Sequence, residues 1–95
     1  MQVVWTRRAY RHLDDIQDFI AHESPRAAEA LANDILDRSD LLLANNPLIG
    51  RPGRVDETRE LVLSGTPYIV VYRVRADIEI LALLHSSRDW PESFS

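Results

Sequence analysis

Three arginines in the middle of the chain have the chemistry to bind carboxylates or phosphates. The stretch GRPGRVDETREL runs from Gly50 to Leu61 and holds Arg51, Arg54 and Arg59. A guanidinium group presents a planar fork of N–H donors that matches two oxygens of one anion. The proline between Arg51 and Arg54 fixes its own φ and stiffens the loop that carries them. We therefore predict a rigid cationic docking surface.

The same arginines have a purely structural alternative. Acidic residues stand beside them at Asp56, Glu57 and Glu60, and a local network of ion pairs would use the guanidinium groups internally. We favour the docking role for Arg51 and Arg54. For Arg59, which begins a predicted strand, both interpretations stay open.

A second cluster lies in the C-terminal stretch LLHSSRDWPESF. His85 ends an apolar segment, and Arg88 and Trp90 follow within five residues. An unperturbed imidazole titrates near neutral pH, so His85 is a candidate for acid–base chemistry. Arg88 is a candidate contact residue, whereas for Trp90 we favour a packing role over the end of the core.

Other kinds of site find little support. The three histidines His12, His22 and His85 are scattered and have no second ligand at metal-site spacing. The GRPG stretch lacks the spacing of either common phosphate-binding loop. Ser86 and Ser87 beside His85 are too generic to indicate a nucleophile. We predict no metal and no cofactor.

Composition limits the protein class further. The formal net charge is −4, all eleven basic residues are arginine, and cysteine is absent. Residues 47–76 carry five arginines against three acidic residues, whereas residues 1–46 carry five against eight and residues 77–95 one against four. No disulfide or thiolate metal site can form. With no signal-peptide core and no apolar run of ~20 residues, we expect a cytoplasmic protein without membrane contact.

Hydrophobic periodicity divides the chain into helices and strands. Two segments with helical spacing are separated by Ser24 and Pro25, a typical N-cap and first-turn pair. After Pro47, β-branched and alternating residues indicate strands. We predict a strand at Gln2–Trp5, helices at Arg7–His22 and Pro25–Ala44, and strands at Arg59–Leu63, Tyr68–Arg75 and Ile78–His85. We expect irregular structure at Pro47–Thr58, with Leu48 and Ile49 turned inward.

The order β-α-α-β-β-β predicts one α+β domain over residues 1–95. A helical hairpin covers one face of an antiparallel sheet, the last three strands form a meander, and the first strand joins the edge. Alternate residues of the Tyr68–Arg75 strand face opposite sides of the sheet. Arg73 and Arg75 then mark the place where the uncovered face meets water.

Three stretches together resemble the RelE/ParE superfamily of type II toxin–antitoxin toxins. They read VVWTRRAYRHLDDIQDFIAHESPRAAEAL, NPLIGRPGRVDETREL and PYIVVYRV…IEILALLHSSRDWP, and they extend in family order from Trp5 to Pro91. The forms GRPGRVxxTREL and HxxRDWP are more similar to the ParE branch than to RelE. The resemblance implies a small bacterial toxin with a helical hairpin on an antiparallel sheet, which is the RelE/ParE-like fold.

The resemblance also implies a partner. It would be a cognate antitoxin, encoded next to the toxin and of the ribbon-helix-helix type. Its flexible C-terminal segment would wrap the toxin while its N-terminal part binds operator DNA, so the toxin would reach DNA only through the antitoxin. A disordered segment needs a long apolar track to offset its ordering cost, which an uncovered sheet face supplies.

The two branches differ in their targets. RelE-type members cut mRNA in the ribosome with basic residues and a C-terminal tyrosine, whereas ParE-type members inhibit DNA gyrase without being enzymes. Here Ile69 stands in place of the strand arginine of RelE, Phe94 in place of its tyrosine, and the lysines are absent; only Arg88 matches. RNA cleavage needs a base and cations at those positions.

We therefore predict a gyrase inhibitor that blocks replication by protein contact. Arg51, Arg54 and Arg59 would form its contact patch for the target or the antitoxin, with Arg73, His85 and Arg88 as secondary members. The first alternative is an mRNA endonuclease that uses His85 and Arg88 with Arg51 and Arg54. The second is an inactive relative that serves only as an antitoxin-binding co-repressor.

Overall fold

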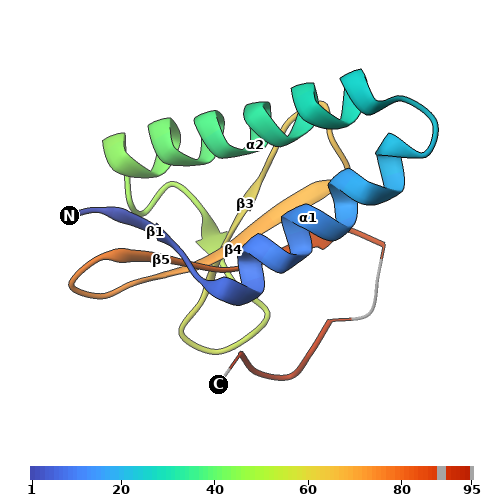
Figure 1. The fold of residues 1–95 in the computed structure, drawn as a ribbon. Helices are drawn as coiled ribbons and strands as arrows, with labels where there is room; N and C mark the ends of the chain where they lie inside the picture. Colours follow the sequence, from blue (N-terminus) through green and yellow to red (C-terminus); the bar gives the residue numbers. More distant parts are fainter. Residues whose placement is uncertain (88–89, 95) are drawn as a thin grey trace.

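The computed structural model describes residues 1–87 and 90–94, and in this part the chain forms two helices and five strands (Figure 1). Their order along the chain is β1 (Val3–Trp5), α1 (Arg7–Ala21), α2 (Pro25–Asn45), β2 (Arg51–Pro52), β3 (Arg59–Val62), β4 (Tyr68–Val74) and β5 (Ile78–His85). The predicted α+β fold, a helical hairpin on a sheet, is confirmed. Five of the six predicted elements differ from the observed ones by one residue at one end, and β5 has the predicted bounds.

Both helices begin at hydroxyl side chains. The Thr6 hydroxyl accepts a hydrogen bond from the Ala9 N–H at 3.3 Å and donates one to the Ile80 carbonyl at 2.8 Å, so the start of α1 is joined to β5. The Ser24 hydroxyl accepts from the Ala27 N–H at 3.2 Å, and a proline follows at the first helical position. These caps satisfy N–H groups that have no partner inside the helix.

The sheet has the order β1-β5-β4-β3-β2. Its neighbouring strands are antiparallel except for β1, which runs parallel to β5. The first strand therefore joins the edge of the meander, as expected. The two-residue strand β2 was not expected, and it pairs Arg51 with Glu60 and Pro52 with Arg59 at the opposite edge. In Figure 1 the two helices lie together on one side of the sheet.

The central strand β4 is covered on both of its faces. Val70 and Tyr72 belong to the main core beneath the helices, whereas Ile69 and Val71 form a smaller cluster on the outer face. This is the predicted alternation. In β5 a register shift leaves Leu81 without a partner in β4, so Ile80 and Leu83 both face the helices although they lie three residues apart. An extra residue of this kind reverses the facing of all that follow.

The expected inward orientation of Leu48 and Ile49 is wrong, because their side chains are 60% and 43% exposed. The inner side of this loop is occupied by backbone groups bonded to Tyr72. Its hydroxyl accepts the Gly50 N–H at 2.8 Å and donates to the Pro47 carbonyl at 2.9 Å. Burial raises the pKa of Tyr72, although the Gly50 N–H and Arg59 oppose the shift, so the hydroxyl keeps the proton that it donates.

Gly50 has no room for a side chain. A Cβ at this position would lie 2.7 Å from the Tyr72 ring and hydroxyl. The loop thus approaches the core more closely than any residue with a side chain would allow. In the described part of the chain, no helix is both long enough and apolar enough to cross a membrane.

The contacts of Tyr72 give a first prediction. Replacing Tyr72 with Phe leaves the Gly50 N–H and the Pro47 carbonyl without their partner, so the free energy of unfolding should fall by about 1–3 kcal/mol. Urea denaturation measures this change. Tyr10→Phe is the matched control, because Tyr10 is 50% exposed. Removing the Tyr10 hydroxyl should change the free energy of unfolding by less than about 0.5 kcal/mol. Equal stability of the Tyr72 variant and the wild type would show that the hydroxyl does not hold the loop.

Candidate functional site

The Glu60 carboxylate lies at the centre of the arginine segment. It is 3% exposed, although it is charged, and it faces the outer side of the sheet opposite Val71. Arg51 donates to its Oε1 from Nε at 3.2 Å and from Nη2 at 2.9 Å. Arg54 donates to Oε2 from its backbone N–H at 2.8 Å and from Nε at 3.1 Å, and to Oε1 from Nη2 at 3.2 Å. Five donors therefore surround one buried carboxylate.

These donors determine the charge state of Glu60. Burial alone would raise the pKa of its carboxyl group, but the hydrogen bonds from Arg54 and Arg51 outweigh it and lower the pKa. The ion-pair alternative is thus present for Arg51 and Arg54. Their side chains are nevertheless 55% and 46% exposed. Arg51 is held by Glu60 and is otherwise more than half exposed, which is the geometry that a preorganised docking surface requires, whereas the Arg54 guanidinium also stacks on Trp90.

Arg59 has a different role in the same loop. Its Nη1 donates to the Gly50 carbonyl at 2.9 Å and lies 3.5 Å from the Leu48 carbonyl. Among the described residues it forms no ion pair, so its charge is not neutralised by a carboxylate there. Arg59 therefore braces the loop by hydrogen bonds and adds positive charge to it.

The C-terminal segment covers the outer face of the sheet beside Arg54. Trp90 and Phe94 pack against the cluster of Ile69, Val71 and Ala82. The Arg54 guanidinium carbon lies 3.7 Å from the centre of the Trp90 ring, within the range of a cation–π interaction. The predicted packing role of Trp90 is confirmed, although it covers the smaller outer cluster. Over β4 and β5 the face that we expected to be partly open is covered, whereas Val62 of β3, which pairs with Ile69 on the same face, is 48% exposed.

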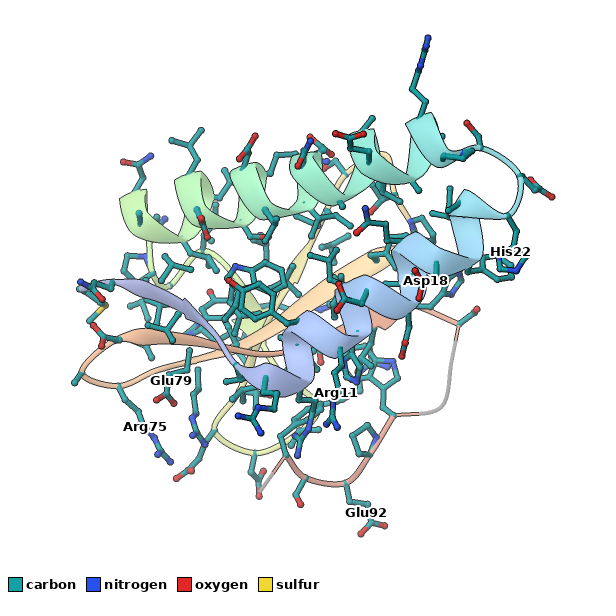
Figure 2. The ribbon with its side chains drawn as sticks, viewed as in Figure 1. Arg11, Asp18, His22, Arg75, Glu79 and Glu92 are labelled. Atoms are coloured by element: carbon teal, nitrogen blue, oxygen red, sulfur yellow. The ribbon has the colours of Figure 1, made fainter. Side chains whose placement is uncertain are left out.

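Arg73 and Arg75 lie near the turn between β4 and β5. Arg73 forms an ion pair with Glu79 on the neighbouring strand, whereas Arg75 is exposed. Figure 2 shows Arg75 and Glu79 at the opposite end of the molecule from Asp18 and His22. Arg73 is therefore already paired within the chain.

His85 lies apart from the arginines. Leu83 of the same strand belongs to the main core and Leu84 packs on the outer cluster, so His85 faces the helix side. Arg51 and Arg54 gather around Glu60 on the outer face, where Trp90 stacks on Arg54. The acid–base site that would combine His85 with these two arginines is not assembled. Arg88, the remaining member of the predicted set, lies outside the described residues.

A cavity of about 670 Å³ opens between α1 and the ends of β4 and β5. Its polar lining consists of His12, Asp15, Tyr68, His85 and Ser87, above apolar residues that include Ile16, Phe19 and Leu83. The His85 Nδ1 accepts the Ser87 N–H at 3.1 Å and lies 2.7 Å from the Ser87 hydroxyl. No group of three or more histidines, aspartates or glutamates in residues 1–87 and 90–94 is arranged to hold a metal ion.

Sequence reasoning missed that His12 and His85 line the same cavity. The His12 Nδ1 accepts the Leu83 N–H at 3.2 Å, which ties α1 to β5. Burial and the nearby Arg8 lower the pKa of His12, and Asp15 opposes them. The neutral imidazole is the form that this hydrogen bond needs. No local pattern relates positions 12 and 85, because only the packing of α1 on β5 brings them together.

Glu60 gives a second prediction. Its lowered pKa means that it stabilises the fold above the ordinary glutamate pKa of about 4.3, and that this contribution is lost as the pH falls toward the lower folded value. Glu60→Gln should therefore cost about 1–3 kcal/mol at pH 7 and less at pH 3. Urea denaturation at both pH values measures the difference. Glu57→Gln, an exposed change in the same loop, should have little effect at either pH. A Glu60→Gln cost that does not depend on pH would contradict this account.

His12 gives a third prediction. Between its lowered folded pKa and the ordinary value of 6.5, the unfolded chain binds more protons than the folded one, so stability should fall as the pH drops below about 6.5. His12→Asn keeps an acceptor for the Leu83 N–H but cannot titrate. In this variant the corresponding part of the pH dependence should disappear from thermal unfolding curves recorded between pH 5 and 8. An unchanged slope would assign the proton uptake to another group.

Three comparisons place the chain among known proteins. Residues 3–90 match the family model described as "ParE toxin of type II toxin-antitoxin system, parDE". The chain is 44% identical over 91 residues to "Putative toxin Y4kP" of Sinorhizobium fredii (strain NBRC 101917 / NGR234), which covers 96% of this chain and 94% of that protein. It is 39% identical over 89 residues to "Toxin RelE2" of Caulobacter vibrioides, covering 92% and 97% of the two chains.

A solved structure agrees with these sequence relatives. A chain of "Chromosomal ParDE TA system from P. aeruginosa" superposes with a TM-score of 0.78 at 32% identity, covering 90% of this chain and 95% of that one. This chain thus shares its fold with a solved chain of a toxin–antitoxin system. The chain belongs to the ParE family of type II toxin–antitoxin toxins, a family whose members have an antitoxin as their partner.

Proposed function

We propose that this toxin inhibits DNA gyrase by protein–protein contact and thereby blocks replication. The main observation in support of this proposal is the burial of Ile69. This residue stands where the resemblance puts the strand arginine of RelE, and it is 3% exposed beneath Trp90 and Phe94. A cation needed to hold a scissile phosphate has no counterpart at that position.

Two further features support a role without RNA cleavage. Phe94, which stands at the position of the RelE tyrosine, has no hydroxyl and packs against the sheet. The exposed sides of Arg51 and Arg54 are held rigid by Glu60, so a partner's carboxylates would meet donors that are already oriented. This arrangement suits binding of a protein surface, where rigid arginines are frequent anchors.

The proposal includes the partner and the compartment. We infer an antitoxin of the ribbon-helix-helix type, encoded beside the toxin, that neutralises it in the cytoplasm and alone contacts operator DNA. A neighbouring reading frame of similar length with an amphipathic C-terminal end would support this part.

An mRNA endonuclease is the second candidate. It is favoured by the cavity where His12 and His85 lie together with Asp15, since two imidazoles can act as acid and base. A relative of this chain also bears the name RelE2. A third possibility, an inactive relative retained as co-repressor, predicts unimpaired growth when the toxin is expressed without an antitoxin.

The fourth prediction tests the target directly. Purified toxin should inhibit supercoiling by gyrase and leave a translated message intact on ribosomes. Arg51→Ala removes an exposed guanidinium while Arg54 still binds Glu60, and it should weaken inhibition by about tenfold or more. Arg26→Ala, which removes an exposed arginine from α2, is the matched control and should keep wild-type potency. Message cleavage that is lost in His85→Ala, with gyrase untouched, would overturn the proposal.

A further inference from the structure

Leu48 and Ile49 are two large aliphatic side chains that point into solvent from the loop between α2 and β2. Single exposed leucines and isoleucines are normal on protein surfaces and need no explanation. Exposure alone therefore says little about this pair. The way in which the loop is built says more.

Four sets of contacts fix the backbone that carries the pair. The Ile49 N–H donates to the Asn46 carbonyl at 3.0 Å, and the Gly50 N–H donates to the Tyr72 hydroxyl. Tyr72 also donates to the Pro47 carbonyl, and Arg59 holds the Gly50 carbonyl. Two apolar side chains are thus displayed from a backbone anchored in the core. Such a pair loses little conformational freedom when it enters a partner's pocket.

Two arginines lie near the pair. Arg59, beneath the loop, forms no ion pair within the described residues, and Arg51 follows Ile49 by two positions with a half-exposed guanidinium. A shallow depression of about 350 Å³ adjoins Leu48, and its other lining residues are Pro52, Glu57, Thr58, Arg59 and Val74. In residues 47–76 five arginines stand against three acidic residues. Protein interfaces have an apolar core, and arginine is enriched among their residues.

We propose that Leu48 and Ile49 are the apolar anchors of the target-binding surface, and that they enter an apolar depression bordered by carboxylates on the target protein. This inference rests on the proposed function, in which the toxin acts on gyrase by contact. The two arginines beside the pair indicate the kind of partner. Carboxylates around an apolar depression on the target would complement Arg51 and Arg59. The antitoxin is the competing occupant, and the experiment distinguishes it from the target.

The fifth prediction is tested with the double variant Leu48→Ser/Ile49→Ser. Both side chains are exposed, so the variant should fold and melt as the wild type does. Its inhibition of gyrase supercoiling should fall by about tenfold or more, while its affinity for the purified antitoxin should stay within about twofold. Leu41→Ser is the matched control, since Leu41 on α2 is 64% exposed, close to the 60% of Leu48, and should keep full potency.

Each other result has a definite meaning. Wild-type potency in the double variant, or a loss of antitoxin affinity alone, overturns the inference while the proposed function stands. A wild type that leaves gyrase untouched but stops growth overturns the proposed function. In that case growth arrest by the double variant tests whether Leu48 and Ile49 are anchors. Arrest equal to that of the wild type would overturn their anchoring role. Loss of arrest would support that role on a target other than gyrase. A wild type without either activity overturns both.

Discussion

The Tyr72 hydroxyl joins the core of this toxin to its arginine loop. Tyr72 is fully buried on the helix side of the central strand, yet its hydroxyl reaches the backbone of residues 47–50 and binds it at two points. A buried tyrosine of this kind requires both partners, because an unsatisfied hydroxyl or N–H in the core is costly. The loop cannot move away without exposing those groups. The position of Gly50, the outward direction of Leu48 and Ile49, and the start of β2 all follow from this contact.

The opposite side of the same strands supplies the second constraint. Val71 faces outward next to Glu60, whose carboxylate is surrounded by Arg51 and Arg54. A lone buried carboxylate would destabilise the fold, and the two guanidinium groups offset this cost. The arginines in turn are ordered because Glu60 cannot leave. Structural ion pairing and display for a partner are therefore compatible for Arg51, whose side chain binds Glu60 and is still 55% exposed. The ion-pair role and the docking role that the sequence suggested therefore do not exclude each other for Arg51.

The parts predictable from sequence are those governed by local periodicity. The helical hairpin follows from the apolar spacing and from Ser24 and Pro25, and the two faces of β4 follow from strict alternation of its side chains. The continuous apolar run of β5 hides the register shift at Leu81, because every residue there is acceptable on either face. β2 was missed because it is two residues long and contains a proline, which normally argues against a strand. Leu48 and Ile49 were misplaced because hydrophobicity predicts burial, whereas here the backbone of their loop occupies the inner side.

The outer face is covered over β4 and β5, and this explains why positive charge is displayed from a loop and not from these strands. A toxin that holds RNA against its strands needs an open face with cationic side chains on it. Here that face carries Ile69, Val71 and Ala82, and Trp90 and Phe94 pack over them. Removing the C-terminal segment from this face would expose apolar surface and break the stacking of Trp90 on Arg54, so the closed arrangement is favoured by burial and by charge together. Cations available to a partner must then stand at the edge, where β2 and its loop present Arg51 and Arg59. Arginines presented at an edge in this way suit contact with another protein better than binding of a nucleic-acid strand. The cavity that His12 and His85 line beneath α1 is a separate feature on the other face.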